Sequence, residues 1–349
     1  MRILITGTDG YIGCVLAPAV IDAGHEVVGL DTRYFDEALL GAPPRSGYPV
    51  IVKDLRDIAI GDLDGIDAVM HLAGLSNDAL GELSRRVTFD INHRATVRLA
   101  RLCKEAGVER FIYSSSCSVY GKSSADIVTE ESPFDPQTDY AVCKMLDERE
   151  LSDLADDRFS PTFLRNATAY GASPRMRFDL VVNNLSALAW TTKRIAMVSD
   201  GTPWRPIVHI LDISRAFLAA LTAPREAVHN QVFNVGRTDE NYQIREIATC
   251  VGEVFPDCEV TFGKSDPDQR SYRVSFDKVT TELPGFSCDW DLRAGATQLR
   301  TLYEQTALSK TDFEHRPFTR IKQLRHLLSE GRIDAEFYWK RSGARGHAT

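Results

Sequence analysis

Three glycines between an apolar strand pattern and a helical stretch constrain the fold of this chain more than any other feature. The N-terminal segment reads MRILITGTDGYIG and carries Gly7, Gly10 and Gly13. Glycines at this spacing allow a tight turn and let a pyrophosphate approach the backbone at the N-terminus of a helix. Because the GxxGxxG spacing differs from the GxGxxG of most dinucleotide dehydrogenases, a glycine-rich turn without function is the alternative.

Strand and helix patterns alternate through the first half of the chain. Short apolar or β-branched runs cover residues 2–6, 26–31, 49–54, 67–74 and 110–116, and helical patterns cover 11–24, 81–107 and 140–155. Near-continuous apolar strands separated by helices are typical of a parallel sheet covered on both faces. We therefore predict an α/β fold with a Rossmann-type doubly wound parallel sheet, in which ligands bind at the carboxyl ends of the strands.

The pattern changes near residue 170. Short strands over 194–201, 206–212, 231–236 and 259–263 lie among helices over 207–223 and 243–255. This indicates a smaller C-terminal α/β region that shares strands with the first. We expect an NAD-binding domain over 1–170, to which some later strands and helices return, a substrate-binding region over 171–309 and a basic helical extension over 310–349.

The C-terminal extension differs in charge from the rest of the chain. It holds nine Lys or Arg and five Asp or Glu, whereas the whole chain has a net charge of −8. Ile321, Leu324, Leu327 and Leu328 fall on one helical face. This predicts a helix packed on its own protein or on a second copy, with a dedicated partner-binding element as the less favoured alternative.

Composition excludes several classes of partner. The net charge of −8 gives no electrostatic reason to expect nucleic acid or an anionic membrane surface. The apolar runs are shorter than a membrane span, and the chain opens on a strand pattern rather than a signal peptide. The seven cysteines form neither a CxxC pair nor a metal-ligand spacing, which indicates reduced thiols in a cytoplasmic protein without a metal site. His71, alone in an apolar run, is interpreted as a core residue.

Polar and small residues at the ends of later strands fit the same dinucleotide. Asp31 ends the second strand, where a carboxylate can accept hydrogen bonds from adenosine ribose hydroxyls and repel a 2′-phosphate. This favours NAD over NADP, although Arg33 nearby could hold such a phosphate. Further residues expected along the dinucleotide are Asp54, Leu55, Ala73 and Gly74.

A tyrosine and a lysine are spaced for proton transfer. Tyr140 and Lys144 lie at i and i+4, one above the other on a helix. Tyrosine has an unperturbed pKa of about 10, but a nearby ammonium favours the phenolate. Tyr140 could then take a proton from a sugar hydroxyl while hydride leaves the same carbon, and Lys144 would also hold the nicotinamide ribose. Ser116, at the end of the 110–116 strand, is expected to bond the same substrate oxygen.

Taken in order, these motifs carry a family resemblance. TGTDGYIG, HLAG, SSSCSVYG, the YxxxK pair, YGASPR and PIVHILDISRAF follow one another within residues 1–300. The chain resembles the extended short-chain dehydrogenases/reductases of the NAD-dependent nucleotide-sugar epimerase/dehydratase group. The resemblance implies a tightly held NAD that is reduced and reoxidised within one turnover, a C-terminal region that binds a nucleoside diphosphate sugar, and a homodimer.

The resemblance also implies roles for individual residues. For the cofactor these are Gly7, Gly10, Tyr11, Ile12, Gly13, Asp31, Arg33, Asp54, Leu55, Leu72, Ala73, Gly74, Asn92, Tyr140 and Lys144. For the substrate they are Ser116, Ser118, Arg175, Asn183, Arg205 and Arg270. The candidate catalytic residues are Ser116, Tyr140, Lys144 and, under one alternative, Cys117.

The two residues after Ser116 bear on the reaction. The 4,6-dehydratases of this group carry Asp-Glu there, and the uronate decarboxylases tend to keep a Glu at the second position. This chain has Cys117 and Ser118, and the UDP-galactose 4-epimerases likewise carry small residues. The pattern therefore favours epimerisation at C4 through a transient 4-keto sugar.

Several alternatives stay open. A thiolate at Cys117 could remove a proton from a carbon beside a ketone, as in a 5,6-elimination or a 3,5-epimerisation, although a packing role is the plainer interpretation. A nucleotide-sugar reductase or dehydrogenase that releases its cofactor is another. A non-catalytic NAD-binding sensor or scaffold is disfavoured because Ser116, Tyr140 and Lys144 are all present. The SPRMRFDLVVNN segment (173–184) departs from the 4-epimerase pattern and leaves the sugar and nucleotide open.

Overall fold

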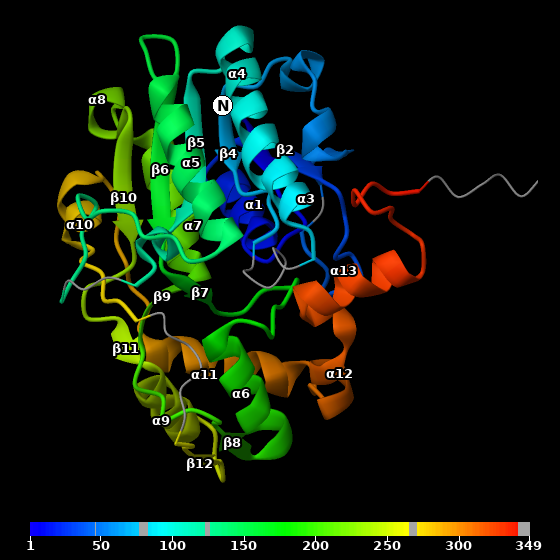
Figure 1. Cartoon of the computed structure of the whole chain (residues 1–349), viewed down its shortest axis with the longest axis vertical. Helices are drawn as coiled ribbons and strands as arrows, with labels where there is room; N and C mark the ends of the chain where they lie inside the picture. Colours follow the sequence, from blue (N-terminus) through cyan, green and yellow to red (C-terminus); the bar gives the residue numbers. More distant parts are fainter. Residues whose placement is uncertain (46, 77–82, 123–125, 265–270, 341–349) are drawn as a thin grey trace, which may run out of the picture.

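A seven-stranded sheet in the order β10-β6-β5-β4-β1-β2-β3 forms the centre of the molecule (Figure 1). The computed structural model describes residues 1–45, 47–76, 83–122, 126–264 and 271–340. The strands are β1 (Arg2–Thr6), β2 (Glu26–Asp31), β3 (Val50–Val52), β4 (Ala68–His71), β5 (Arg110–Ser116), β6 (Ser160–Asn166) and β10 (Gln231–Val235). Every pairing between them is parallel, so the predicted Rossmann-type sheet is confirmed.

Helices cover both faces of this sheet. The core on one face includes α1 (Gly13–Asp22) and α7 (Ile210–Thr222), and the core on the other includes α4 (Ala95–Ala106) and α5 (Asp139–Asp153). Along β1, Ile3 and Ile5 pack in the first core and Leu4 in the second. Successive side chains of a strand point to opposite faces, so a strand buried on both faces is apolar throughout.

The smaller region lies beneath the carboxyl ends of the strands (Figure 1). It contains a three-stranded sheet in the order β11-β9-β7 and a two-stranded β12-β8 pair. These strands are β7 (Thr168–Tyr170), β8 (Arg194–Ala196), β9 (Trp204–His209), β11 (Asn241–Gln243) and β12 (Glu259–Thr261). Its helices are α6 (Val181–Thr192), α9 (Ile244–Val254) and α11 (Leu292–Gln305). The short helices α8 (Arg225–Val228) and α10 (Asp277–Glu282) instead contact the central sheet, α8 at β6 and β10 and α10 at β10. β10 pairs with β6 in the central sheet and α7 packs on one of its faces, so some later elements belong to the first layer structure.

Several element boundaries differ from the sequence prediction. The helix expected over 81–107 is divided into α3 (Arg85–Phe89), a π-helical turn (Asp90–Arg94) and α4. The helix expected over 207–223 begins only at Ile210, because His209 ends β9 and its Nδ1 accepts a hydrogen bond from the backbone of Leu211. β6 was not predicted, since its proline, arginine and asparagine interrupt the apolar pattern of a fully buried strand.

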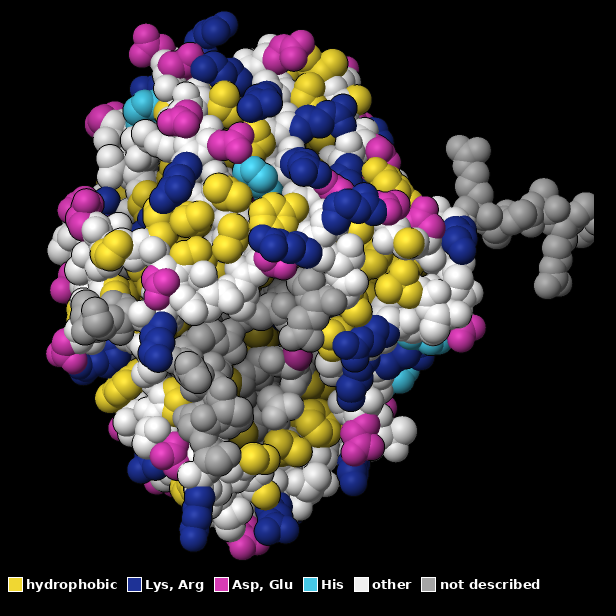
Figure 2. Space-filling model, in the orientation of Figure 1, with side chains coloured by type: hydrophobic (Ala, Val, Ile, Leu, Met, Phe, Trp, Pro, Cys, Tyr) yellow, Lys and Arg dark blue, Asp and Glu magenta, His cyan; other side chains and the backbone are white. Residues whose placement is uncertain are grey.

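The C-terminal extension packs on its own protein, which confirms the plainer of the two interpretations. It consists of α12 (Lys310–Glu314), a short turn at Arg316–Phe318 and α13 (Arg320–Ser329). Leu324 and Leu327 join a cluster with Tyr34, Val87 and Ile91. Lys and Arg side chains gather over the place of α12 and α13 in Figure 2. Within the described ranges, none of the helices has the length and apolarity to cross a membrane.

Candidate active site

One cavity of about 930 Å³ opens at the carboxyl ends of the central strands. It is bordered by the glycine turn, by the ends of β2, β4, β5 and β6, and by residues of the smaller region. Most of the predicted site residues line this one cavity. They are Gly7, Gly10, Tyr11, Ile12, Gly13, Asp31, Asp54, Leu55, Leu72, Ala73, Gly74, Ser116, Ser118, Tyr140, Lys144 and Arg205.

The glycine turn is shaped by close backbone approach. Gly7 has a φ of +77° and a Cβ added there would lie 3.0 Å from the backbone nitrogen of Ala73. A Cβ on Gly13 would lie 2.1 Å from the carbonyl oxygen of Gly7. No side chain caps the N-terminus of α1 at Ile12, and Ile12 and Gly13 line the cavity. An uncapped helix N-terminus behind such a turn fits a pyrophosphate.

Asp31 lies at the end of β2, at the edge of the cavity. Its carboxylate accepts hydrogen bonds from the backbone nitrogens of Asp9 (3.0 Å) and Arg33 (2.8 Å). Burial raises the pKa of Asp31 to about 6. Arg33 does not line the cavity, since its Nε pairs with the Asp9 carboxylate at 3.0 Å. The arginine expected to hold a 2′-phosphate is thus engaged elsewhere, and the arrangement fits NAD.

The proposed catalytic side chains come from β5 and α5. Ser116 ends β5, and its Oγ accepts a hydrogen bond from the backbone nitrogen of Ser118 at 3.2 Å. Lys144 Nζ lies 5.6 Å from the ring centroid of Tyr140. Burial lowers the pKa of Lys144 to about 8. The side chains of Ser116, Tyr140 and Lys144 all border the same cavity, so residues that are separated along the sequence lie close together in space.

Two polar atoms facing the cavity have no hydrogen-bond partner among the described residues. They are the Oγ of Ser118 and the Oδ1 of Asn166, and both are buried. Buried polar atoms normally find a partner, so these two are suited to a polar ligand. Asn166, the last residue of β6, was missed by sequence reasoning because β6 itself was not predicted.

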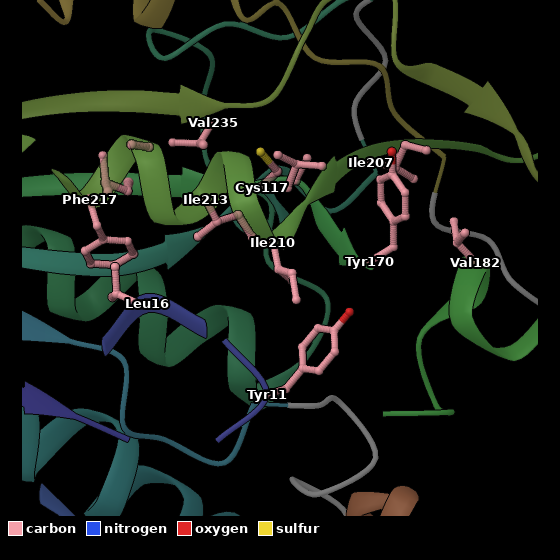
Figure 3. Packing of buried hydrophobic residues seen from close by; sticks show 14 of the residues in the cluster. Tyr11, Leu16, Cys117, Tyr170, Val182, Ile207, Ile210, Ile213, Phe217 and Val235 are labelled. Carbon is pink, nitrogen blue, oxygen red and sulfur yellow. The ribbon is translucent and has the colours of Figure 1, made fainter. Parts of the chain in front are cut away.

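The structure corrects the candidate role of Cys117. Its side chain is 1% exposed, does not line the cavity and packs in the same apolar cluster as Ile213 and Val235 (Figure 3). The Sγ donates a hydrogen bond of 3.1 Å to the carbonyl oxygen of Arg165. Burial raises the pKa of the thiol far above its usual value. A neutral thiol turned into the core is a packing group and not a base.

Three further predicted residues lie beside the cavity without lining it. Asn92 accepts from the backbone nitrogen of Leu75 at 2.7 Å and so holds the loop after β4. Asn183 is fully buried and donates to the hydroxyl of Tyr11 at 2.9 Å. Arg175 donates to the backbone carbonyl of Asp36.

The cavity is lined instead by Arg177, two residues beyond Arg175. Its guanidinium pairs with the carboxylate of Asp179 at 3.0 Å. The alternation of arginines in SPRMRFD was the signal for this residue, but spacing could not say which one faces the ligand. Arg270 lies outside the described residues.

His71 is a core residue, as predicted. Its Nδ1 lies 2.6 Å from the Thr6 hydroxyl and its Nε2 lies 2.8 Å from the Thr96 hydroxyl. Burial lowers the pKa of His71 to about 3, so the imidazole is neutral. No group of three or more His, Cys, Asp or Glu that could hold a metal ion occurs in the part of the chain that the structure describes.

A doubly wound sheet with a glycine turn, a strand-end carboxylate and a Ser-Tyr-Lys cluster defines a dinucleotide-dependent enzyme of the Rossmann class. The model of the NAD dependent epimerase/dehydratase family matches residues 3–236, and the chain belongs to this family. It is therefore an NAD-dependent epimerase/dehydratase family enzyme.

Individual relatives agree with this assignment. The UDP-glucose 4-epimerase of Bacillus subtilis is 28% identical over 282 residues, which cover 73% of this chain and 82% of that protein. Among solved structures, MoeE5 in complex with UDP-glucuronic acid and NAD has a TM-score of 0.76 at 27% identity and covers 88% of this chain and 100% of its own. The UDP-glucuronic acid 4-epimerase of Bacillus cereus has a TM-score of 0.71 at 26% identity, and the match covers 87% of this chain and 100% of that structure's chain.

Proposed function

We propose that this enzyme epimerises C4 of a nucleoside diphosphate sugar, most directly a UDP-hexose or UDP-hexuronate, through a transient 4-keto intermediate. The UDP sugars named for the relatives motivate the choice of nucleotide. One observation carries the proposal: Ser116, Tyr140 and Lys144 border the cavity, while the Cys117 thiol points away from it. This arrangement supports redox at one carbon over a mechanism in which the thiol removes a proton from a neighbouring carbon.

The carboxylates around the cavity agree with this choice. Among the described residues that line it, these are Asp31, Asp54 and Asp179. Asp31 and Asp54 follow β2 and β3, where the adenosine is expected, and each is paired with neighbouring donors. Asp179 is held by Arg177. None of them occupies the positions after Ser116 from which a dehydratase of this family works.

In the proposed mechanism each side chain has one task. NAD, when bound, supplies a reversible hydride acceptor. Tyr140 takes the proton of the C4 hydroxyl and later returns it. The ammonium of Lys144 favours the phenolate form of Tyr140, and Ser116 donates a hydrogen bond to the C4 oxygen, where negative charge develops. The Ser118 hydroxyl and the Oδ1 of Asn166 are available to bond other sugar hydroxyls. Arg205, which lines the same cavity from β9, suits the sugar-nucleotide diphosphate.

The test is incubation of UDP-, dTDP- and GDP-sugars with enzyme and NAD in heavy water, followed by chromatography and mass spectrometry. The proposal expects a new isomer of unchanged mass with no deuterium on carbon. Carbon-bound deuterium, or loss of water, would show that a proton left a carbon beside the ketone and would overturn the assignment. A Tyr140→Phe sample controls for contaminating activity. The expected homodimer is a separate prediction, checked by light scattering.

A further inference from the structure

The C-terminal extension reaches the cofactor cavity. Thr319, Arg320 and Ile321, at the start of α13, line the same cavity as the glycine turn and Asp31. In Figure 1, α13 runs beside the carboxyl-terminal edge of the sheet, next to the smaller region. The family model ends at residue 236, so this contribution to the site lies outside the matched segment.

The extension docks on residues 32–37, the loop that directly follows Asp31. Tyr34 packs in one apolar cluster with α13 and donates a hydrogen bond from its hydroxyl to the carbonyl oxygen of Phe337. The indole of Trp339 donates to the carbonyl oxygen of Thr32 at 2.6 Å. The loop that carries the adenosine end of the cofactor site is therefore covered by the C-terminal segment.

Arg320 is a buried cation within this contact. Its side chain is 3% exposed, and its guanidinium lies 4.2 Å from the ring centroid of Phe35. Its hydrogen bonds go to two backbone carbonyls, those of Pro317 (3.1 Å) and Arg175 (3.3 Å). No carboxylate lies within ion-pairing distance of Arg320 in the described part of the chain. A buried charge without a counter-ion is costly, which points to an anion in the loaded enzyme.

A second buried arginine stands nearby with one carboxylate between the two. Arg177 also lines the cavity and is paired with Asp179. Burial, and next the positive charge of Arg177, lower the pKa of Arg320 to about 9. Asp179 is taken up by Arg177, and the Asp31 carboxylate acts on Arg320 without an ion-pair contact among the described residues. Guanidinium groups suit phosphate oxygens geometrically.

We propose that Arg320 and Arg177 bind the diphosphate of the bound NAD, so that the C-terminal extension is a built-in part of the cofactor site. The position favours NAD over the sugar nucleotide, because Arg320 stacks on Phe35, four residues after Asp31, whereas Arg205 comes from β9 of the smaller region. A segment that contacts the cofactor directly must be more stably docked when the cofactor is present. This inference depends on the family's cofactor and not on which sugar is epimerised.

The test compares Arg320→Gln with Arg325→Gln, a matched change at an exposed residue of the same helix. NAD content of the purified proteins is measured after denaturation, and NADH and UDP are titrated separately into NAD-stripped protein. Arg320→Gln is expected to weaken NADH binding about 10- to 100-fold, the range for a buried charge-assisted hydrogen bond. Binding of UDP should stay within about twofold, and Arg325→Gln should match the wild type on both.

Unchanged NADH affinity in folded Arg320→Gln protein would overturn the proposal, and a loss confined to UDP would assign the arginine to the sugar nucleotide instead. Hydrogen exchange on the wild type keeps the proposal testable if the variant does not fold. NADH should slow exchange over residues 320–337, whereas UDP alone should not. No protection by NADH would contradict the coupling between the cofactor and the extension.

Discussion

Lys144 on α5 donates a hydrogen bond of 2.7 Å from its Nζ to the backbone carbonyl oxygen of Ser114 on β5. This bond joins the helix that carries Tyr140 to the strand that ends at Ser116. The ammonium also lies 4.4 Å from the ring centroid of Tyr113, in the same strand. The lysine thus ties the helix of the proposed proton acceptor, Tyr140, to the strand of the proposed hydrogen-bond donor, Ser116.

Tyr140→Phe should lower kcat by about 10²- to 10⁴-fold, the usual contribution of a positioned acid-base group. Only the hydroxyl is removed, so NAD content and thermal stability should match the wild type. Tyr338→Phe is the matched control and should retain activity. Tyr338 lies near the C-terminus, and its hydroxyl is 3.4 Å from Asp57 Oδ1. Full turnover by Tyr140→Phe would remove Tyr140 from the mechanism.

Cys117→Ala should keep kcat within about twofold, because the thiol packs in the core. Removing a buried side-chain atom leaves a small cavity and should cost about 1 kcal/mol of unfolding free energy. Urea unfolding and steady-state kinetics on the same sample separate the two effects. Loss of activity in a protein that unfolds like the wild type would revive the 5,6-elimination and 3,5-epimerisation alternatives.

NADH affinity should fall below about pH 6, where Asp31 becomes protonated. Its pKa is raised from 3.8 to about 6 by burial, and only the ionised carboxylate accepts bonds from both ribose hydroxyls. The apparent Kd should rise toward tenfold per pH unit below pH 6, as measured by NADH fluorescence. Asp31→Asn should bind weakly at every pH and lose this dependence; a wild-type curve flat down to pH 5 would contradict the assignment.

The same carboxyl group should affect the stability of the cofactor-free protein. The folded state holds the Asp31 proton more tightly than the unfolded state, so this contribution is complete below pH 3.8 and is lost as pH rises through about 6. In Asp31→Asn protein stripped of NAD, this loss between pH 4 and pH 6 should be absent. Thermal unfolding of both proteins across this range measures the difference.

Gly13→Ala should abolish stable NAD retention, because the added Cβ would lie 2.1 Å from the carbonyl oxygen of Gly7. Relief requires the turn or α1 to move, at a cost of about 1–3 kcal/mol or more. Gly61→Ala is the control, since the nearest atom to its Cβ is Asp64 Oδ2 at 4.0 Å. NAD content and Tm that are equal in the two variants would show that the close approach is unimportant.

Local spacing predicted a large part of this protein. A strand, a glycine turn and a helix within thirteen residues define the phosphate cradle, and Asp31, Ser116 and the Tyr140–Lys144 pair were found because each occupies a strand end or one helical face. These patterns are decided over a few residues, where backbone geometry alone dictates the direction of a side chain. β6 was not predicted because a buried strand with polar side chains has no such local pattern.

The sequence by itself determined the fold class, and it located the proposed cofactor cradle and the proposed residues for proton transfer, since each depends on neighbours in the chain. Only the tertiary structure decided that Cys117 points into the core, that Arg177 rather than Arg175 faces the cavity, and that Arg320 joins Phe35 across 285 positions of the chain. The direction of a side chain and its contacts with residues far away in the sequence depend on how helices and sheets pack together. That packing is a property of the whole chain.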